Sequence, residues 1–229
     1  YIIAISVLFF TATSCTDVLN QQAVDSFNQE VVFADINIVK AYLGKCYDRM
    51  GGNTDYGILG LREDLLSSAT DQTLCIHRPA NYVDIKGTMS PSTLGFYANN
   101  NYGGYLRWGN LYANIQNLNT ILANIDAVKV TTIDEQALKD RLKGETYFVR
   151  AYMYAQLLFA HGGVVLLKDP FKLGQEYASI KRSSIADTKD FILDDIAQAI
   201  PLLTGKATEQ GRATPAAAAA LKSRVLLFC

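Results

Sequence analysis

Histidine and runs of positive charge are scarce in this sequence. His77 and His161 are the two histidines in 229 residues. A His-Glu-x-x-His metal pattern, a nucleophile elbow and a glycine-rich phosphate loop are all missing. Neighbouring carboxylates such as Asp194 and Asp195 would point about 100° apart on a helix and could not share a substrate. Basic residues number 21 against 22 acidic ones, without a long basic run, which argues against nucleic-acid binding. We expect no enzyme, no cofactor and no metal site.

Cysteine is also sparse, with four residues in the chain. Cys46 falls on an apolar helix face, Cys75 lies in a predicted loop, and Cys229 is the last residue. Cys15 follows an apolar run. These positions do not form a disulfide framework, so stability must come from packing.

The first fourteen residues have the pattern of an export signal. Residues 1–10 are nearly all apolar, residues 12–14 are small, and the chain turns polar directly after Cys15. The apolar run is too short to span a membrane, which takes about 20 residues. We predict that 1–14 is a signal peptide lacking its start and that Cys15 receives a lipid anchor. An ordinary secretory signal is the alternative, because Ala12 stands where bacterial lipoproteins usually have Leu.

Apolar residues at spacings of three and four predict a helical protein. Capping boxes at Thr132-x-x-Glu135 and Ser184-x-x-Asp187 mark two helix starts, and Thr214-Pro215 marks a third. The expected helices cover 35–50, 106–128, 133–161 and 185–203, with a last one from about 214. Residues 51–105 form a long irregular excursion, and 163–167 hold the one weak strand pattern. The fold class is all-α, with stacked helical hairpins of a degenerate tetratricopeptide-like type.

Two charged positions are expected to hold helices together. Glu145 and Arg150 lie in the apolar second half of the helix at 133–161, which should be the central one. Buried charges need partners, so both are assigned structural roles. On the helix at 185–203, Asp194 and Asp195 are expected to face solvent, and Pro201 to kink or end the helix.

Three segments form a combination with a specific order: "LKGETYFVRAYMYAQLLFAHGGVVLL", "IKRSSIADTKDFILDDIAQAIPLL" and "GRATPAAAAALKSRVLLF". Together they resemble the SusD/RagB family of outer-membrane nutrient-uptake lipoproteins, and "WGNLYANIQNLNTIL" fits a further family helix. Each piece is weak alone, but their order and spacing are specific. The resemblance covers nearly the whole chain and strengthens the prediction of lipid attachment at Cys15.

Membership would imply a helical, non-catalytic protein that is lipid-anchored at the cell surface of the outer membrane. Such a protein covers a SusC-like TonB-dependent channel, binds an oligosaccharide or a peptide and helps to hand it inward. Residues 15–34 would be the lipid-attached lead, and 35–229 the N-terminal part of the helical domain, truncated at its end. We also expect 16–229, expressed alone, to aggregate.

Aromatic residues and amides alternate between 96 and 112, a composition that suits sugar binding. The ligand-binding candidates are Tyr97, Tyr102, Tyr105, Trp108, Asp71 and Arg78. The competing interpretation is that Trp108 and Tyr112 are core residues beside the apolar stripe, and that Asp71 and Arg78 are ordinary surface or loop-bracing groups. Peptide capture, a tetratricopeptide-type interaction scaffold and, more remotely, a lipid-anchored glycosidase remain as alternative functions.

Overall fold

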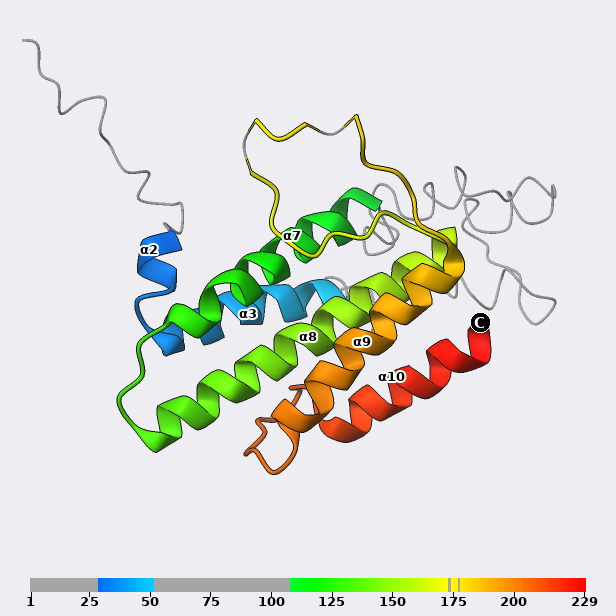
Figure 1. Ribbon diagram of the computed structural model, residues 1–229. Helices are drawn as coiled ribbons and strands as arrows, with labels where there is room; N and C mark the ends of the chain where they lie inside the picture. Colours follow the sequence, from blue (N-terminus) through cyan, green and yellow to red (C-terminus); the bar gives the residue numbers. More distant parts are fainter. Residues whose placement is uncertain (1–28, 52–107, 173, 177) are drawn as a thin grey trace, which may run out of the picture.

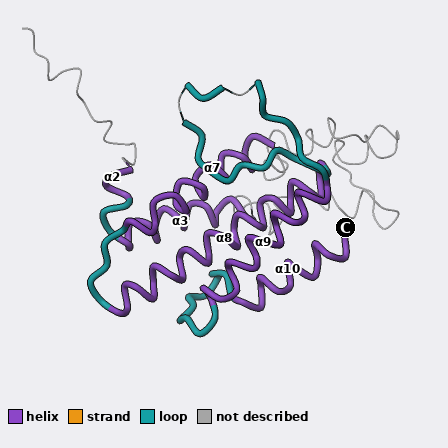
Figure 2. The backbone as a smooth tube through the Cα atoms, in the orientation of Figure 1, coloured by secondary structure: helices purple, strands orange, loops and turns teal. Residues whose placement is uncertain are grey.

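The computed structural model describes residues 29–51, 108–172, 174–176 and 178–229 as a stack of helices (Figure 1). The elements are α2 (Gln29–Val32), α3 (Ile36–Gly51), α7 (Trp108–Asn124), the 3-10 turn η4 (Ile125–Ala127), α8 (Ile133–His161), α9 (Ile185–Leu203) and α10 (Pro215–Phe228). Helices and loops account for all of these ranges, and no strand occurs within them (Figure 2). The predicted all-α fold class is confirmed, and the weak strand pattern at 163–167 forms no strand.

α8 is the central helix of the stack, as its apolar second half predicted. It contacts α3 and α7 on one side and α9 on the other, and α10 packs mainly on α9 (Figure 1). Among its buried residues, Leu142, Val149 and Leu157 are fully inaccessible. A helix buried over most of its circumference is apolar nearly all round.

Capping explains why α8 and α9 begin where they do. In α8 the Thr132 hydroxyl accepts from the Glu135 amide at 3.1 Å, and the Glu135 carboxylate accepts from the Thr132 amide at 3.1 Å. The Ser184 and Asp187 pair makes the same reciprocal contacts at the start of α9. Both helices therefore have the predicted bounds. Pro201 lies inside α9, which ends at Leu203, two residues further on.

α8 and α9 approach each other closely at Gly144. A Cβ at this position would lie 2.8 Å from the Leu202 Cβ and 3.3 Å from the Ala199 carbonyl oxygen. Glycine is therefore required for the observed spacing of the two helices. The alanine-rich α10 packs in a similar way, with Ala218, Leu221 and Val225 buried on one face.

Both charges that were predicted to be buried and paired, Glu145 and Arg150, have buried ionic partners, and the Arg150 pair joins two helices. Arg150 forms a double hydrogen bond with Asp195 of α9, with Nε to Oδ2 at 2.8 Å and Nη2 to Oδ1 at 2.7 Å. Glu145, fully buried, pairs with Arg141 and with Arg212, each at 3.2 Å. The Arg150–Asp195 pair thus connects α8 to α9, whereas Glu145 connects α8 to the loop before α10 through Arg212.

The expected solvent-facing position of Asp195 is wrong. Its exposed fraction is 4%, while Asp194 is exposed. The reason is Arg150, which supplies a buried cation that the periodicity of α9 alone does not reveal. Within the described ranges, no helix combines the length and the hydropathy that crossing a membrane requires.

Candidate functional site

Trp108 is the one predicted ligand-binding residue that falls within the described ranges. Tyr97, Tyr102, Tyr105, Asp71 and Arg78 lie outside them, as does the predicted lipid-attachment residue Cys15. The structure therefore bears on the candidate site through Trp108 and the residues around it.

Trp108 is the first residue of α7, and its exposed fraction is 36%. The competing interpretation that it belongs to the core is wrong. Trp108 continues the α7 stripe, but α8 ends beside it at His161, so among the helices of the described ranges none extends over the indole. Tyr112, one turn later, is half-buried, and its hydroxyl donates to the Val165 carbonyl oxygen at 2.6 Å.

The indole of Trp108 contacts the rings of Tyr112 and His161. Its centroid lies 4.9 Å from that of Tyr112 at an interplanar angle of 39°, and 5.3 Å from the His161 ring in an edge contact at 77°. Tyr112 in turn meets Tyr154 of α8 edge to face at 6.4 Å. Contacts of this kind hold an aromatic side chain in one orientation. The exposed part of the indole is thus presented on a fixed support.

Arg182 completes this group of residues from the loop before α9. Its Nε donates to the Gly163 carbonyl oxygen at 2.7 Å, and its Nη2 donates to the His161 carbonyl oxygen. The guanidinium carbon lies 5.8 Å from the centre of the Trp108 ring. These carbonyls belong to the C-terminal end of α8, where a cation is favoured by the helix dipole.

The loop reaches this position because two glycines end α8. Gly162 has a φ of 73°, which favours glycine. A Cβ on Gly163 would lie 2.2 Å from the Ser183 carbonyl oxygen. Only glycine therefore allows the loop residues before α9 to lie this close to the end of α8. The sequence showed both glycines and Arg182, but not that the arginine meets a tryptophan 74 positions earlier in the chain. We name Trp108, Tyr112, His161 and Arg182 the Trp108 cluster.

The segment 164–171 runs beside α7 and is held by its polar side chains. Tyr112, Gln116 and Asn119 are spaced by four and three, which places them on one face of the helix. Gln116 donates to the Phe171 carbonyl oxygen at 3.3 Å and accepts from the Phe171 amide at 2.8 Å. Asn119 donates to the carbonyl oxygens of Leu167 and Asp169. These side chains supply the main-chain hydrogen bonds that a neighbouring strand would otherwise provide.

The pKa shifts of Tyr112 and Tyr154 agree with a structural role for these two side chains. Burial raises the pKa of Tyr112, although its bond to Val165 and the nearby Arg182 charge oppose the shift. Burial also raises the pKa of Tyr154, whose hydroxyl accepts from the Leu167 amide at 2.8 Å. Both phenols therefore stay protonated at neutral pH and remain hydrogen-bond donors.

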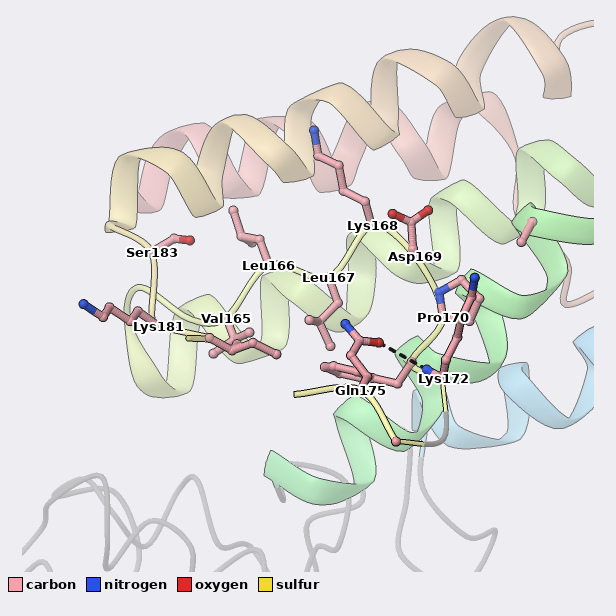
Figure 3. A pocket seen from close by; sticks show the side chains of 14 residues that line it. Val165, Leu166, Leu167, Lys168, Asp169, Pro170, Lys172, Gln175, Lys181 and Ser183 are labelled. Atoms are coloured by element: carbon pink, nitrogen blue, oxygen red, sulfur yellow. Dashed lines mark hydrogen bonds between the residues drawn. The ribbon is translucent and has the colours of Figure 1, made fainter. Parts of the chain in front are cut away.

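An open cleft of about 940 Å³ lies inside the loop that joins α8 to α9 (Figure 3). Its lining comes from residue 123 of α7 and from the loop between 165 and 183. Lys168 extends toward α9 and Lys181 points in a different direction, so their charges do not converge (Figure 3). The Gln175 side-chain oxygen already accepts a hydrogen bond from the Lys172 amide at 3.2 Å. The cleft lacks convergent polar groups, and the Trp108 cluster is the better candidate site.

The Trp108 cluster offers an exposed ring and a fixed cation, groups that can pack against a ligand and donate hydrogen bonds to it. In the described part of the chain no three His, Cys, Asp or Glu side chains come together as a potential metal site.

Comparisons with known proteins cover most of the sequence. Residues 62–227 match the SusD-like family described as "Starch-binding associating with outer membrane". A SusD-like protein from Bacteroides fragilis is 26% identical and superposes with a TM-score of 0.70, over 88% of this chain and 36% of its own. No curated protein sequence matches the chain.

Two further solved structures share the fold at lower identity. A laminarin-binding SusD-like protein is 19% identical with a TM-score of 0.64, over 84% of this chain and 40% of its own. Surface glycan-binding protein A from Bacteroides fluxus is 20% identical with a TM-score of 0.58, over 85% of this chain and 40% of its own. The chain thus spans 36% to 40% of the length of these three structures.

Proposed function

The chain belongs to the SusD-like family, and from this premise we propose that it is a cell-surface glycan-binding lipoprotein. It captures oligosaccharides and delivers them to a SusC-like TonB-dependent channel of the outer membrane. It binds its ligand and does not convert it. The family match over 62–227 supports the assignment to glycan capture, and so do the names of two structural neighbours, one a laminarin-binding protein and the other a surface glycan-binding protein.

The observation that carries the proposal within this chain is the exposed indole of Trp108. A flat aromatic face packs against the C–H face of a pyranose ring, while nearby N–H donors serve the hydroxyl groups. Trp108 offers such a face at 36% exposure, and Arg182 offers donors beside it. We propose that Tyr97, Tyr102, Tyr105, Asp71 and Arg78 extend the same site.

Peptide capture is the alternative within the family, and it receives less support. It would use side-chain amides that face a groove and can bond to a peptide main chain. The Gln116 and Asn119 amides instead bond to the main chain between 167 and 171 of this protein.

Calorimetric titration of the full-length mature protein with plant, host and microbial oligosaccharides, and with mixed peptides, tests the proposal. We expect saccharide binding that Trp108→Ala weakens by about tenfold or more, since loss of an aromatic stacking surface costs about 1 to 3 kcal/mol. Ile133→Ala is the matched control, because Ile133 is 89% exposed at the opposite end of α8. If the protein binds peptides but no saccharide, peptide capture replaces the proposal. If Trp108→Ala binds saccharides as tightly as the parent, Trp108 is not part of the binding site.

Lipid attachment at Cys15 is a separate part of the proposal. Acylation of this residue would place the protein on the outer membrane. Cys15→Ser should abolish incorporation of labelled palmitate in cells and release the protein from the membrane fraction, whereas Cys46→Ser should retain both. Equal labelling of the two variants would contradict the assignment.

A further inference from the structure

The guanidinium group of Arg182 is anchored and exposed, and no carboxylate of the described ranges pairs with it. Its Nε and Nη2 donate to the main-chain carbonyls of Gly163 and His161. No ion pair joins it to any carboxylate within 29–51, 108–172, 174–176 and 178–229. The nearest acid that follows in sequence, Asp187, is engaged by the Ser184 hydroxyl at 2.7 Å in the α9 capping box.

The arrangement leaves one side of the guanidinium group available. Arginine has five N–H donors in a planar fork. The carbonyls at the end of α8 take the side formed by Nε and Nη2, so the Nη1 donors and the second Nη2 donor remain. Donors on Nη1 and Nη2 can bind a carboxylate with two parallel hydrogen bonds.

Anchoring also reduces the conformational entropy that a surface arginine loses when it binds a ligand. A free side chain of this length loses rotamer freedom when it binds. Arg182 has already lost that freedom through its two carbonyl contacts and its position 5.8 Å from the Trp108 ring. A ligand that meets the exposed part of Trp108 therefore meets a fixed cation that lies over the same ring.

We propose that Trp108 and Arg182 form a subsite for a carboxylate-bearing sugar, in which the indole supports the ring and the guanidinium binds the acid group. This inference rests on the proposed glycan-binding function and names the class of glycan as acidic. An exposed ion pair contributes up to roughly 1 kcal/mol, so the acidic form of a ligand should bind about fivefold tighter than its neutral form.

The test compares oligogalacturonate with its fully methyl-esterified form, since both present the same ring and differ in charge. Both are titrated calorimetrically into the full chain, alongside a panel of neutral oligosaccharides. We expect the parent to favour the acidic form and Arg182→Gln to lose that preference. Lys181→Gln should keep it, because Lys181 is an equally charged, exposed neighbour without a contact to Trp108. Circular dichroism checks that each variant is folded.

A second measurement needs no variant. The preference of the parent should fall at about 0.5 M salt, because exposed charge pairs are screened. Equal affinity for the two forms, binding of neutral oligosaccharides alone, or an equal loss in Lys181→Gln overturns the acidic subsite and leaves the proposed function standing. Failure to bind any saccharide overturns the proposed function and the subsite with it.

Discussion

Replacing Gly144 by alanine should loosen the contact between α8 and α9. The added Cβ would lie 2.8 Å from the Leu202 Cβ, 3.1 Å from the Leu203 Cγ and 3.3 Å from the Ala199 carbonyl oxygen. The nearest atom is a Cβ and the third is main chain, so relief requires movement of α9 itself. Overpacking of this kind costs about 1 to 3 kcal/mol. Alanine regains up to about 1 kcal/mol of helix propensity.

Subtracting a gain of about 1 kcal/mol from the overpacking cost, we expect Gly144→Ala to lower the free energy of unfolding by up to about 2 kcal/mol. Gly44→Ala is the matched control, because its added Cβ would find no atom nearer than Arg212 Nη2 at 3.9 Å. That change should raise the free energy of unfolding by about 0.5 to 1 kcal/mol. Urea denaturation of the full chain, followed by far-UV circular dichroism, measures both. A Gly144→Ala protein at least as stable as the parent would refute the close approach.

Three other predictions concern groups within the helices. Asp195→Ala leaves the buried Arg150 without its carboxylate and should cost about 3 to 5 kcal/mol in urea denaturation; a loss below about 1 kcal/mol would show that the pair is not buried as described. Bonds from the main chain at 131–132 lower the pKa of Glu135, so its contribution to stability is complete above its usual pKa of 4.5 and disappears as pH falls through the lowered value. The stability difference between parent and Glu135→Gln should therefore vanish in acid, and a difference that is independent of pH would contradict the capping box. Burial raises the pKa of Cys46 to about 12, so iodoacetamide at about pH 8 should label Cys229 and spare Cys46 in the folded protein, as peptide mass mapping would show.

Local signals were sufficient to predict most of the helices. The reciprocal partners at both ends of Thr132-x-x-Glu135 and Ser184-x-x-Asp187 are close in sequence, and the bounds of α8 and α9 were predicted from them. The long α7 stripe likewise predicted a helix, which the structure ends at Asn124 and continues as a short 3-10 turn. Capping and periodicity depend on neighbours within a few residues, so sequence reasoning handles them well.

Features that depend on distant residues were harder to predict. Asp195 was expected to face solvent because nothing near it in the sequence indicates that Arg150, 45 residues earlier, supplies a buried partner. Trp108 had two interpretations, a ligand contact or a core residue, because it continues an apolar stripe, and periodicity does not show that the end of α8 lies beside it. Arg182 was recognised as part of a family motif, but its position over Trp108 depends on how the loop after α8 returns to α9.

The central claim is that saccharides bind against Trp108, and the fluorescence of this residue tests it most directly. Trp108 is the single tryptophan of the given sequence, and the difference in emission between the parent and Trp108→Phe reports this residue alone. Titration of the full chain with an oligosaccharide that calorimetry shows to bind should change the intensity and wavelength of this emission. The change should saturate at the calorimetric dissociation constant, and the ligand should protect the indole from acrylamide quenching. Calorimetric binding that leaves both emission and quenching unchanged would contradict the account.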